Sequence, residues 1–486
     1  MKKLLSCLFA TTLLVLGIVM VGCNGCSKEK DRTSYHIECT LNNDKLTGVQ
    51  TVEFYNSFEN AISTLKFNLF ANAFRQDATY KPISSQYLSK AYKYGESYGS
   101  IKIINCFQND EKLDFKITGQ DSNVLEVTLK EEVFPLNRVT IKIEYQLTLA
   151  NVVARTGIND STINLANFYP ILCAYDENGF YECLYYSHGD PYFSDCADYF
   201  VSITLDKEYC VASSGKITKS KVENNLATHI YSLENARSFA MVISKQFESI
   251  KTVADGVDIT YYYYKDSNPA KSLDYAQKSL KLFSEKFGEY PYPTYSVVQT
   301  EFIQGGMEFP ALVMISDALE EKAYGEVIVH ETAHQWWQTV VGNNEVEYSF
   351  LDEGLSEYSV VLFYEKYPEE GLNRQIIIDS CEKQYRMFCS VIDKLDGKVN
   401  TSMVRGLGDF YSEYEYVNIA YIKPCIMYDY LRKSIGDEKF FKGLRKYYND
   451  YSFKNAIPDD LVGSFEKTGA DTNGFFDSFF SGKVII

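Results

Sequence analysis

The chain has 486 residues, of which 45% are apolar and 23% are charged, the balance of a globular protein rather than a disordered one. A chain of this length usually exceeds one compact core, so two domains after a short leader are expected. The formal charge is −17, from 48 basic and 65 acidic residues, which argues against nucleic acid as a partner because phosphate contacts need a basic face.

Residues 1–22 have the pattern of a secretory signal peptide, with two lysines ahead of a long apolar run. The run ends in Met-Val-Gly-Cys at residues 20–23, which resembles the lipobox of bacterial lipoproteins. That resemblance implies that Cys23 is lipidated and that residues 23–33 tether the body to the cell membrane, outside the cytoplasm. The apolar run is also long enough for an uncleaved transmembrane helix, which is the alternative interpretation.

Twelve cysteines are spread along the chain. Cys23 opens a C-x-x-C pair, but no second pair follows to complete a zinc site, and lipidation accounts for Cys23 better. In an exported protein Cys173 could pair with Cys183, and Cys196 with Cys210. Buried free thiols are equally consistent with the sequence.

Residues 34–247 predict a β-rich N-terminal domain. Apolar and polar residues alternate in GVQTVEF (48–54), LEVTL (125–129) and VTIKIEY (139–145), the period of half-buried antiparallel strands. Turn residues separate these runs, and no long helical pattern interrupts them. The predicted fold of this part is therefore a set of antiparallel sheets.

Residues 248–486 predict a mostly helical α+β domain. Asn268 and Pro269 suit the cap and the first turn of a helix, and apolar residues then recur at helical spacing from 270 to 287. Gly288 and two nearby prolines end that pattern. Helical patterns dominate from there to the end of the chain.

The segment His-Glu-Thr-Ala-His at residues 330–334 predicts a metal site. On a helix His330 and His334 lie on one face, with Cβ atoms about 5–6 Å apart, so both imidazoles can reach one zinc ion. Glu331 lies between them, near the water that such a metal activates. The alternative is an amphipathic helix that happens to contain histidines, but the chain has only five.

A third ligand is predicted downstream, because zinc hydrolases usually take three protein ligands and leave one position for water. Glu353 follows His334 with eighteen residues between them, the spacing of gluzincin peptidases. The sequence therefore predicts one Zn²⁺ per chain, held by His330, His334 and Glu353. Glu357, one helical turn later, orients a ligand or lies on a solvated face.

Two further motifs resemble those of the M1 family of zinc aminopeptidases. Gly-Gly-Met-Glu at residues 305–308 is similar to the family's G-x-M-E-N motif, and Tyr-Ile-Lys-Pro at residues 421–424 to its Y-x-K-G motif. The resemblance implies that Tyr421 stabilises the oxyanion and that Glu308 holds the free α-ammonium of a peptide. It also implies a peptide-binding strand formed by Gly305, Gly306, Met307 and Glu308, and a thermolysin-like catalytic domain over residues 248–486.

The function implied by this resemblance is removal of N-terminal residues from peptides outside the cytoplasm. Zinc would activate a water, and Glu331 would act as general base. Larger family members continue into a C-terminal helical domain, whereas 65 residues follow Tyr421 here, so a short form without that domain is expected. A zinc endopeptidase with an open cleft and a non-catalytic surface lipoprotein that binds peptides or a partner are the alternatives.

Overall fold

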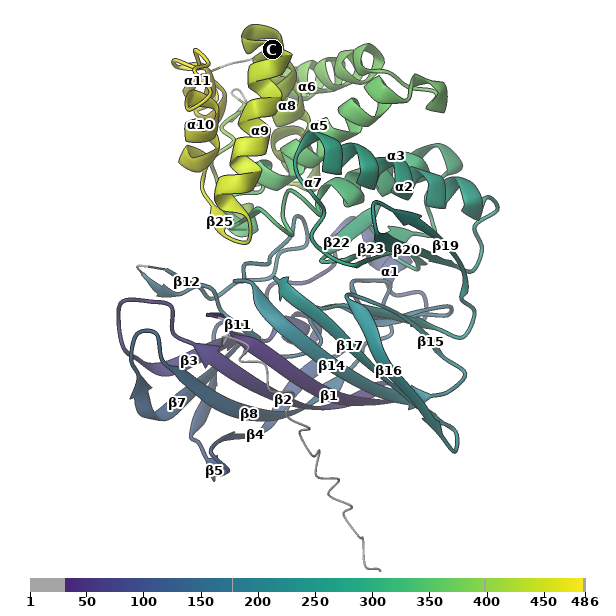
Figure 1. Ribbon diagram of the computed structural model, residues 1–486, viewed down its shortest axis with the longest axis vertical. Helices are drawn as coiled ribbons and strands as arrows, with labels where there is room; N and C mark the ends of the chain where they lie inside the picture. The colour runs from purple at the N-terminus through teal and green to yellow at the C-terminus, as the bar shows by residue number, and fades with distance from the viewer. Residues whose placement is uncertain (1–30, 177, 397–398, 484–486) are drawn as a thin grey trace, which may run out of the picture. The chain divides into compact units, whose positions relative to one another are not determined.

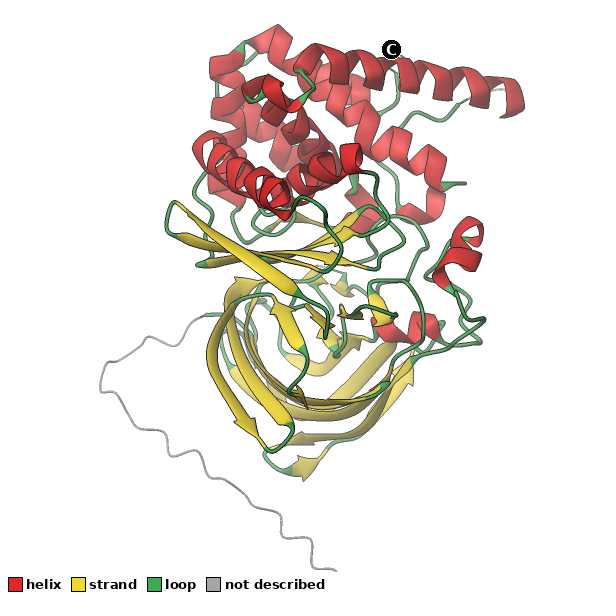
Figure 2. Ribbon diagram, turned by 90° about the vertical axis from the view of Figure 1, so that its right-hand side faces the viewer, coloured by secondary structure: helices red, strands yellow, loops and turns green. Residues whose placement is uncertain are grey.

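One large, strongly curved sheet forms the base of the N-terminal half (Figures 1 and 2). The structure is a computed structural model that describes residues 31–176, 178–396 and 399–483. In spatial order the strands of this sheet are β16 (Lys216–Glu223), β17 (Leu226–Ala236), β14 (Ala197–Asp206), β1 (Ser34–Asn42), β2 (Lys45–Tyr55), β8 (Arg138–Thr148), β4 (Ser100–Gln108) and β5 (Glu111–Lys112). Neighbours pair antiparallel except β1 and β14, which are parallel.

Two four-stranded sheets complete the N-terminal half. One has the order β15 (Cys210–Ser213), β18 (Met241–Ser244), β10 (Ile163–Leu165) and β9 (Thr156–Ile158). The other has the order β11 (Ile171–Leu172), β3 (Ile62–Asn68), β7 (Val124–Val133) and β6 (Phe115–Thr118). A small pair, β12 (Tyr175–Asp176) and β13 (Gly179–Phe180), lies at one side. Between β3 and β4 the chain forms the short helices η1 (Phe70–Phe74), η2 (Ser85–Tyr87) and α1 (Leu88–Ala91).

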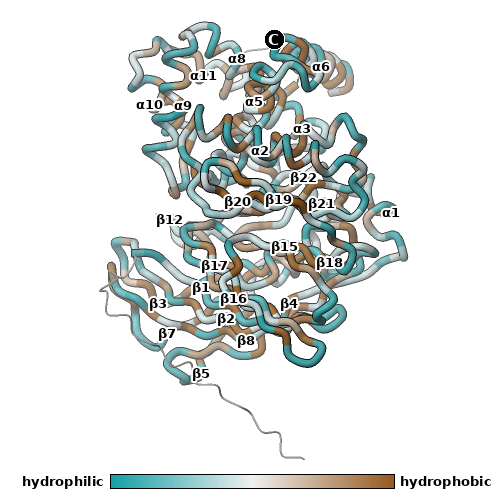
Figure 3. Tube along the Cα trace, turned by 45° about the vertical axis from the view of Figure 1, so that its right-hand side comes forward, coloured by the Kyte–Doolittle hydropathy of each residue, from teal (hydrophilic) through white to brown (hydrophobic). Residues whose placement is uncertain are grey.

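A five-stranded sheet lies between this β-rich half and the helices (Figure 2). Its order is β19 (Glu248–Ala254), β20 (Val257–Tyr263), β21 (Thr294–Thr300), β23 (Leu312–Ser316) and β22 (Gly306–Phe309). Every residue of β23 is buried, whereas β2 alternates buried and less buried positions. Burial on both faces explains why the first four residues of β23 are all apolar. Along the trace of this sheet, hydrophobic stretches alternate with hydrophilic ones around β19, β20 and β21 (Figure 3).

Helices cover the far side of the five-stranded sheet (Figure 1). They are α2 (Pro269–Lys286), α3 (Glu321–Ala333), α4 (Glu345–Tyr348), α5 (Phe350–Lys366), α6 (Arg374–Asp396), α7 (Glu413–Val417), α8 (Lys423–Ile435), α9 (Asp437–Tyr451), α10 (Pro458–Glu466) and α11 (Phe475–Phe480), with the short turns η3 (Pro368–Glu370) and η4 (Leu407–Asp409). A π-helical turn, η5 (Asn418–Ile422), joins α7 to α8. The strands β24 (Gly342–Asn343) and β25 (Asn455–Ala456) pair between the helices. The predicted order of a β-rich domain before a mostly helical one is confirmed.

The predicted domain boundary at residue 247 falls between β18 and β19. Residues 32–486 form one compact unit, so this boundary stays a prediction. The predicted signal peptide over residues 1–22 and the lipidated Cys23 lie outside the described residues. Within the described ranges, no helix combines the length and the apolar character needed to cross a membrane. The nine cysteines described are all free thiols, including Cys173 and Cys196.

Candidate metal centre and active site

Two helices bring the three predicted metal ligands together. His330 lies in the last turn of α3 and His334 caps its C-terminus, so the imidazoles share one face. Glu353 lies in the first turn of α5, which packs against α3. The Nε2 atoms of the two histidines are 3.0 Å apart, and Oε2 of Glu353 lies 3.3 Å and 3.2 Å from them.

These separations fit one zinc ion, because tetrahedral zinc with bonds of about 2.0–2.1 Å places its ligand atoms about 3.3 Å apart. The other ring nitrogens already have partners. Nδ1 of His330 lies 3.1 Å from Oε2 of Glu357, and Nδ1 of His334 lies 3.1 Å from the carbonyl oxygen of Trp337. Because Nδ1–H donates to these oxygens, both Nε2 lone pairs face the point that Glu353 also faces. The donor set therefore suits zinc, and Glu357 orients one ligand.

The charges around the ligands favour a cation at this point. Burial disfavours the imidazolium of His334, but the carboxylates of Glu308 and Glu353 outweigh it and raise the pKa of His334 to about 10. Burial also disfavours the carboxylate of Glu353, but His334 and His330 outweigh it and lower the pKa of Glu353 to about 2. The buried carboxylates thus favour positive charge at this point, and a bound metal ion would supply it.

Glu331 lies beside the ligands, against the edge strand β22. Its side chain is only 6% exposed, and burial together with the Glu308 carboxylate raises its pKa to about 8. A Cβ on Gly306 would lie 2.3 Å from Oε1 of Glu331, so the glycine leaves the space that this carboxyl group fills. Oε2 of Glu331 has no hydrogen-bond partner among the described residues. A raised pKa makes the carboxylate of Glu331 a stronger base than an exposed glutamate, and no protein donor competes for this oxygen.

Glu308 places a second carboxylate next to the candidate metal centre. A Glu308 oxygen lies within 4.8 Å of donor atoms of both Glu331 and His334. Oε1 of Glu308 has no hydrogen-bond partner in the described part of the chain. Behind it, Glu345 and Asp352 each bring an oxygen within 4.8 Å, and burial with the neighbouring carboxylates raises the pKa of both well above the ordinary value. This end of the site is therefore acidic and closed.

Three of the four residues of the predicted peptide-binding strand line the cleft: Gly305, Gly306 and Glu308. The side chain of Met307 does not. Because side chains alternate along a strand, Met307 points the other way and packs in the core with Phe302. The predicted contact of Met307 with a peptide would therefore be made by its backbone.

Tyr421 reaches the site from the π-helical turn η5, a type of turn that often occurs at functional sites. Its ring lies nearly parallel to that of His330, with centroids 5.8 Å apart, and its hydroxyl donates to Glu353. Helices α5 and α8 can approach closely because residue 354 is a glycine. A Cβ there would lie 2.5 Å from Cβ of Pro424. The structure thus brings Tyr421 to the carboxylate that also faces the histidines.

A buried ion pair from the β-rich half completes the cleft. The Arg155 guanidinium pairs with Asp190 and lies 3.3 Å from the carbonyl oxygen of Gly189. Burial outweighs the charge of Arg155 and raises the pKa of Asp190 to about 7. Gly189 has a φ of +67°, and a Cβ there would lie 2.4 Å from Leu407. The sequence analysis did not identify this pair, because neither residue belongs to a motif with recognisable chemistry.

These side chains line one cleft of about 480 Å³ between the β-rich half and the helices.

Residues 271–479 match the family model of the peptidase family M1 domain. Aminopeptidase N of Lactococcus lactis subsp. lactis (strain IL1403) is 24% identical over 409 residues, which cover 74% of this chain and 44% of that protein. Aminopeptidase M1-B of Oryza sativa subsp. japonica is 25% identical over 295 residues, covering 57% and 33%. The chain spans less than half the length of these relatives.

Solved structures of similar fold are also M1 enzymes. The M1 zinc metallopeptidase of Deinococcus radiodurans superposes with a TM-score of 0.67 at 16% identity, covering 94% of this chain and 96% of that one. A mutant of that enzyme bound to a Tyr-Ser-Ala substrate gives a TM-score of 0.67 at 18% identity, covering 94% and 95%. At such identity the likeness shows the fold. The predicted M1 resemblance is confirmed at this level, and the roles of single site residues stay predictions.

Proposed function

We propose that this chain is a zinc-dependent aminopeptidase that acts on peptides with a free N-terminus. The observation that carries the proposal is the position of Glu308, within 4.8 Å of Glu331 and His334. In a peptide the first nitrogen and the first carbonyl carbon are about 2.5 Å apart. A peptide whose first carbonyl lies at the metal ligands therefore places its first nitrogen beside Glu308. A charged α-ammonium there can form an ion pair with the carboxylate, whereas the neutral amide nitrogen of an interior residue cannot. The similarity to proteins named aminopeptidases supports the same conclusion.

His330, His334 and Glu353 would hold one zinc ion. When bound, zinc supplies Lewis-acid activation of a water and polarises the scissile carbonyl. Glu331 accepts the proton at its free Oε2 and returns it to the leaving amine, as a general base that then acts as a general acid. Glu308 binds the α-ammonium through its unpartnered Oε1 and so sets where the chain begins.

Tyr421 would stabilise the negative charge that develops on the carbonyl oxygen. In this structure its hydroxyl donates to Glu353, beside the ligand atoms. A bound substrate offers the hydroxyl a second acceptor at the same place. A single well-placed donor to such an oxyanion lowers the activation barrier by about 3–4 kcal/mol. Tyr421→Phe should therefore lower kcat strongly and change the zinc content little.

The first test compares one fluorogenic peptide with its N-terminus free and acetylated, using purified protein loaded with zinc. Cleavage of the free form alone is expected. Equal cleavage of both forms would favour the endopeptidase and remove Glu308 from the site. Glu331→Gln should keep zinc and lose hydrolysis; full activity of this variant would contradict its role as base. Peptide binding without any turnover would favour the non-catalytic alternative.

We also propose that the protein acts outside the cytoplasm, anchored through a lipid on Cys23. The support is the signal-peptide pattern of residues 1–22 and the lipobox-like sequence that ends in Cys23. The mature protein should carry a lipid on its N-terminal cysteine, detectable by mass spectrometry, and Cys23→Ala should abolish it. An unmodified N-terminus at residue 1 in membrane fractions would favour the retained helix instead.

A further inference from the structure

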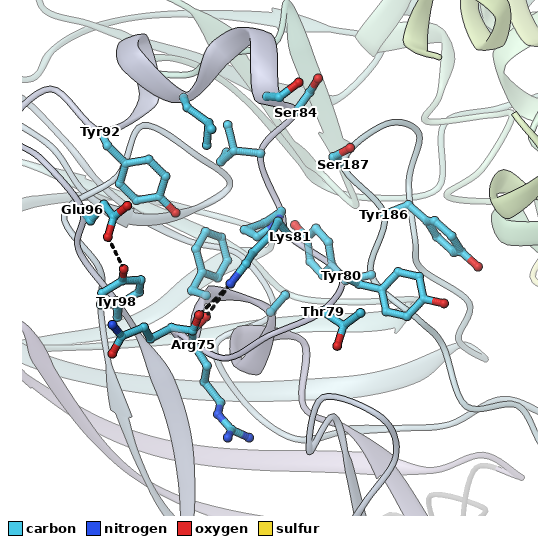
Figure 4. Close-up of a pocket in the computed structure, with 18 of the residues that line it drawn as sticks. Arg75, Thr79, Tyr80, Lys81, Ser84, Tyr92, Glu96, Tyr98, Tyr186 and Ser187 are labelled. Carbon is cyan, nitrogen blue, oxygen red and sulfur yellow. Dashed lines mark hydrogen bonds between the residues drawn. The ribbon is translucent and has the colours of Figure 1, made fainter. Parts of the chain in front are cut away.

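A second cavity lies in the β-rich half (Figure 4). Its volume is about 880 Å³, larger than the roughly 480 Å³ of the cleft. Its walls come from residues 73–98, between β3 and β4, and from residues 185–188. Ser187 and His188 line both the cavity and the cleft, so the two hollows meet at these residues.

Aromatic rings form much of the wall. Tyr80 and Tyr186 meet edge to face with ring centroids 5.5 Å apart, and Tyr92 and Tyr98 lie on the opposite side of the hollow (Figure 4). We call this space the tyrosine cavity. Tyrosine rings offer a large apolar contact area together with hydroxyl groups, the lining expected of a ligand site rather than of a solvated groove.

Residues 84–88 form the wall that the cavity shares with the catalytic cleft. Tyr87 lines the cleft, while Ser84, Ser85 and Leu88 line the cavity. The segment is held to the helical half, because Nε2 of Gln86 lies 2.6 Å from a carboxylate oxygen of Glu413 in α7. The hydroxyl of Tyr87 lies 3.5 Å from the other oxygen of Glu413. The wall therefore has a defined place relative to the metal ligands.

Lys81 puts a positive charge among these rings (Figure 4). Its Nζ donates to the carbonyl oxygens of Gln76 at 2.8 Å and Arg75 at 3.4 Å. No carboxylate of the described residues lies within 4.0 Å of it, whereas Arg75 nearby is paired with Asp77 at 2.6 Å. Lys81 is an exposed residue of the cavity wall, and in a chain with a net charge of −17 an ammonium bonded only to carbonyl oxygens is suited to an anionic ligand.

The opposite end of the cleft gives a peptide no room to extend. Glu308 is 4% exposed and is backed by Glu345 and Asp352. The cavity that it lines on its far side has a volume of only about 20 Å³, too small for an amino acid residue. A peptide whose first residue lies at Glu308 must therefore continue through the open part of the cleft, which the tyrosine cavity extends at Ser187.

We propose that the tyrosine cavity binds the residues of a peptide substrate that follow the cleaved bond, and that Lys81 binds the C-terminal carboxylate. The inference rests on the proposed aminopeptidase function and narrows its substrate class to short oligopeptides with both termini free. Contact with the tyrosine rings holds the downstream residues, and the charge of Lys81 favours chains that end within the cavity.

The test uses the zinc-loaded Glu331→Gln protein, so that peptides bind without being cleaved. Alanine peptides of increasing length, with a free or an amidated C-terminus, are titrated by calorimetry. For the length that spans the cavity, the free acid is expected to bind about three- to fivefold more tightly than the amide, as for a partly exposed charge pair. Lys81→Met should remove that difference, and Lys81→Arg should retain it. Lys90→Met, on the same segment but outside the cavity lining, is the matched control.

Equal affinities of acid and amide at every length, no measurable peptide binding, or a difference that survives Lys81→Met would overturn the inference. A single-residue fluorogenic amide reports on the metal centre alone, because it does not reach the tyrosine cavity. If wild-type protein cleaves that amide while peptides show no preference for a free C-terminus, the proposed function stands and this inference fails. If the amide and all peptides resist cleavage, the proposed function itself fails.

Discussion

Gly306 and Glu331 lie so close together that a Cβ on the glycine would be 2.3 Å from Oε1 of the glutamate and 2.6 Å from its Cγ. The edge strand β22 therefore defines where the candidate base can lie. The contact also explains why the second glycine of the Gly-Gly-Met-Glu motif stands directly opposite the His-Glu-Thr-Ala-His helix.

Gly306→Ala is accordingly expected to displace the Glu331 carboxyl group. A misplacement of about 1 Å costs about 100-fold in rate, so kcat should fall by roughly that factor while zinc content stays unchanged. Gly463→Ala, in α10, is the control, since a Cβ there would have no neighbouring atom within 4 Å. Equal activity of the two variants, measured with a single-residue amide, would contradict the contact.

Removal of Glu357 should weaken metal binding without removing a ligand. The carboxylate lies 3.1 Å from Nδ1 of His330 and holds that ring in the orientation that presents Nε2. Loss of such a partner typically costs about 10–100-fold in metal affinity, which competition with a zinc chelator would measure for Glu357→Ala. Glu369→Ala, an exposed acidic residue just beyond the same helix, should behave as wild type. Unchanged affinity in Glu357→Ala would show that the hydrogen bond has no orienting role.

Asp190→Asn should destabilise the protein by leaving Arg155 without its partner. Breaking one half of a buried ion pair costs about 3–5 kcal/mol of unfolding free energy. The measurement is urea unfolding at pH 8, above the pKa of about 7 of Asp190, where the wild-type carboxylate is charged. Asp160→Asn is the control, because Asp160 is 49% exposed and its pairing with Lys93 contributes at most about 1 kcal/mol. An equal loss of unfolding free energy in both variants would show that the buried pair stabilises the protein no more than the exposed one.

Lys423 makes stability depend on pH in a specific direction. Burial lowers its pKa from 10.5 to about 7, and its Nζ donates to the carbonyl oxygens of Thr401 and Phe479. Below about pH 7 the folded and the unfolded chain both bind this proton, and the cost of burying the charge is fully present. Between about pH 7 and pH 10.5 only the unfolded chain binds the proton of Lys423. The contribution of Lys423 to the free energy of unfolding therefore rises with pH over this range.

The free energy of unfolding of Lys423→Met, relative to that of wild type, should therefore be highest near pH 6 and should fall as the pH approaches 10. Urea unfolding at several pH values checks this. The two carbonyl oxygens left without a donor add a cost that is the same at every pH, so the slope and not the absolute difference is the test. A difference that is constant over this range would show that Lys423 stays protonated in the folded protein.

Local spacing was enough to predict that the candidate metal ligands and the candidate base lie close together. The positions of His330, Glu331 and His334 within one helical turn determine their geometry, whatever surrounds the helix. Periodicity was likewise enough for the order of a β-rich part before a helical one, since alternation of period two and of period 3.6 belongs to single strands and helices. The sequence left open which way the side chain of Met307 points, because whether a strand residue faces the cleft or the core depends on which face the neighbouring layers cover.

The remaining features were decided by contacts between segments far apart in the chain. Tyr421 reaches Glu353 because Gly354 lets Pro424 approach α5, a contact that no spacing in either segment encodes. The Arg155–Asp190 pair and the tyrosine cavity arise in the same way, between segments of the β-rich half that lie far apart in the sequence. The sequence alone determined which functional side chains share one helix or strand, because their relative positions depend on local backbone geometry. The tertiary structure decided what meets in the cleft, because burial and packing act between elements that the sequence keeps apart.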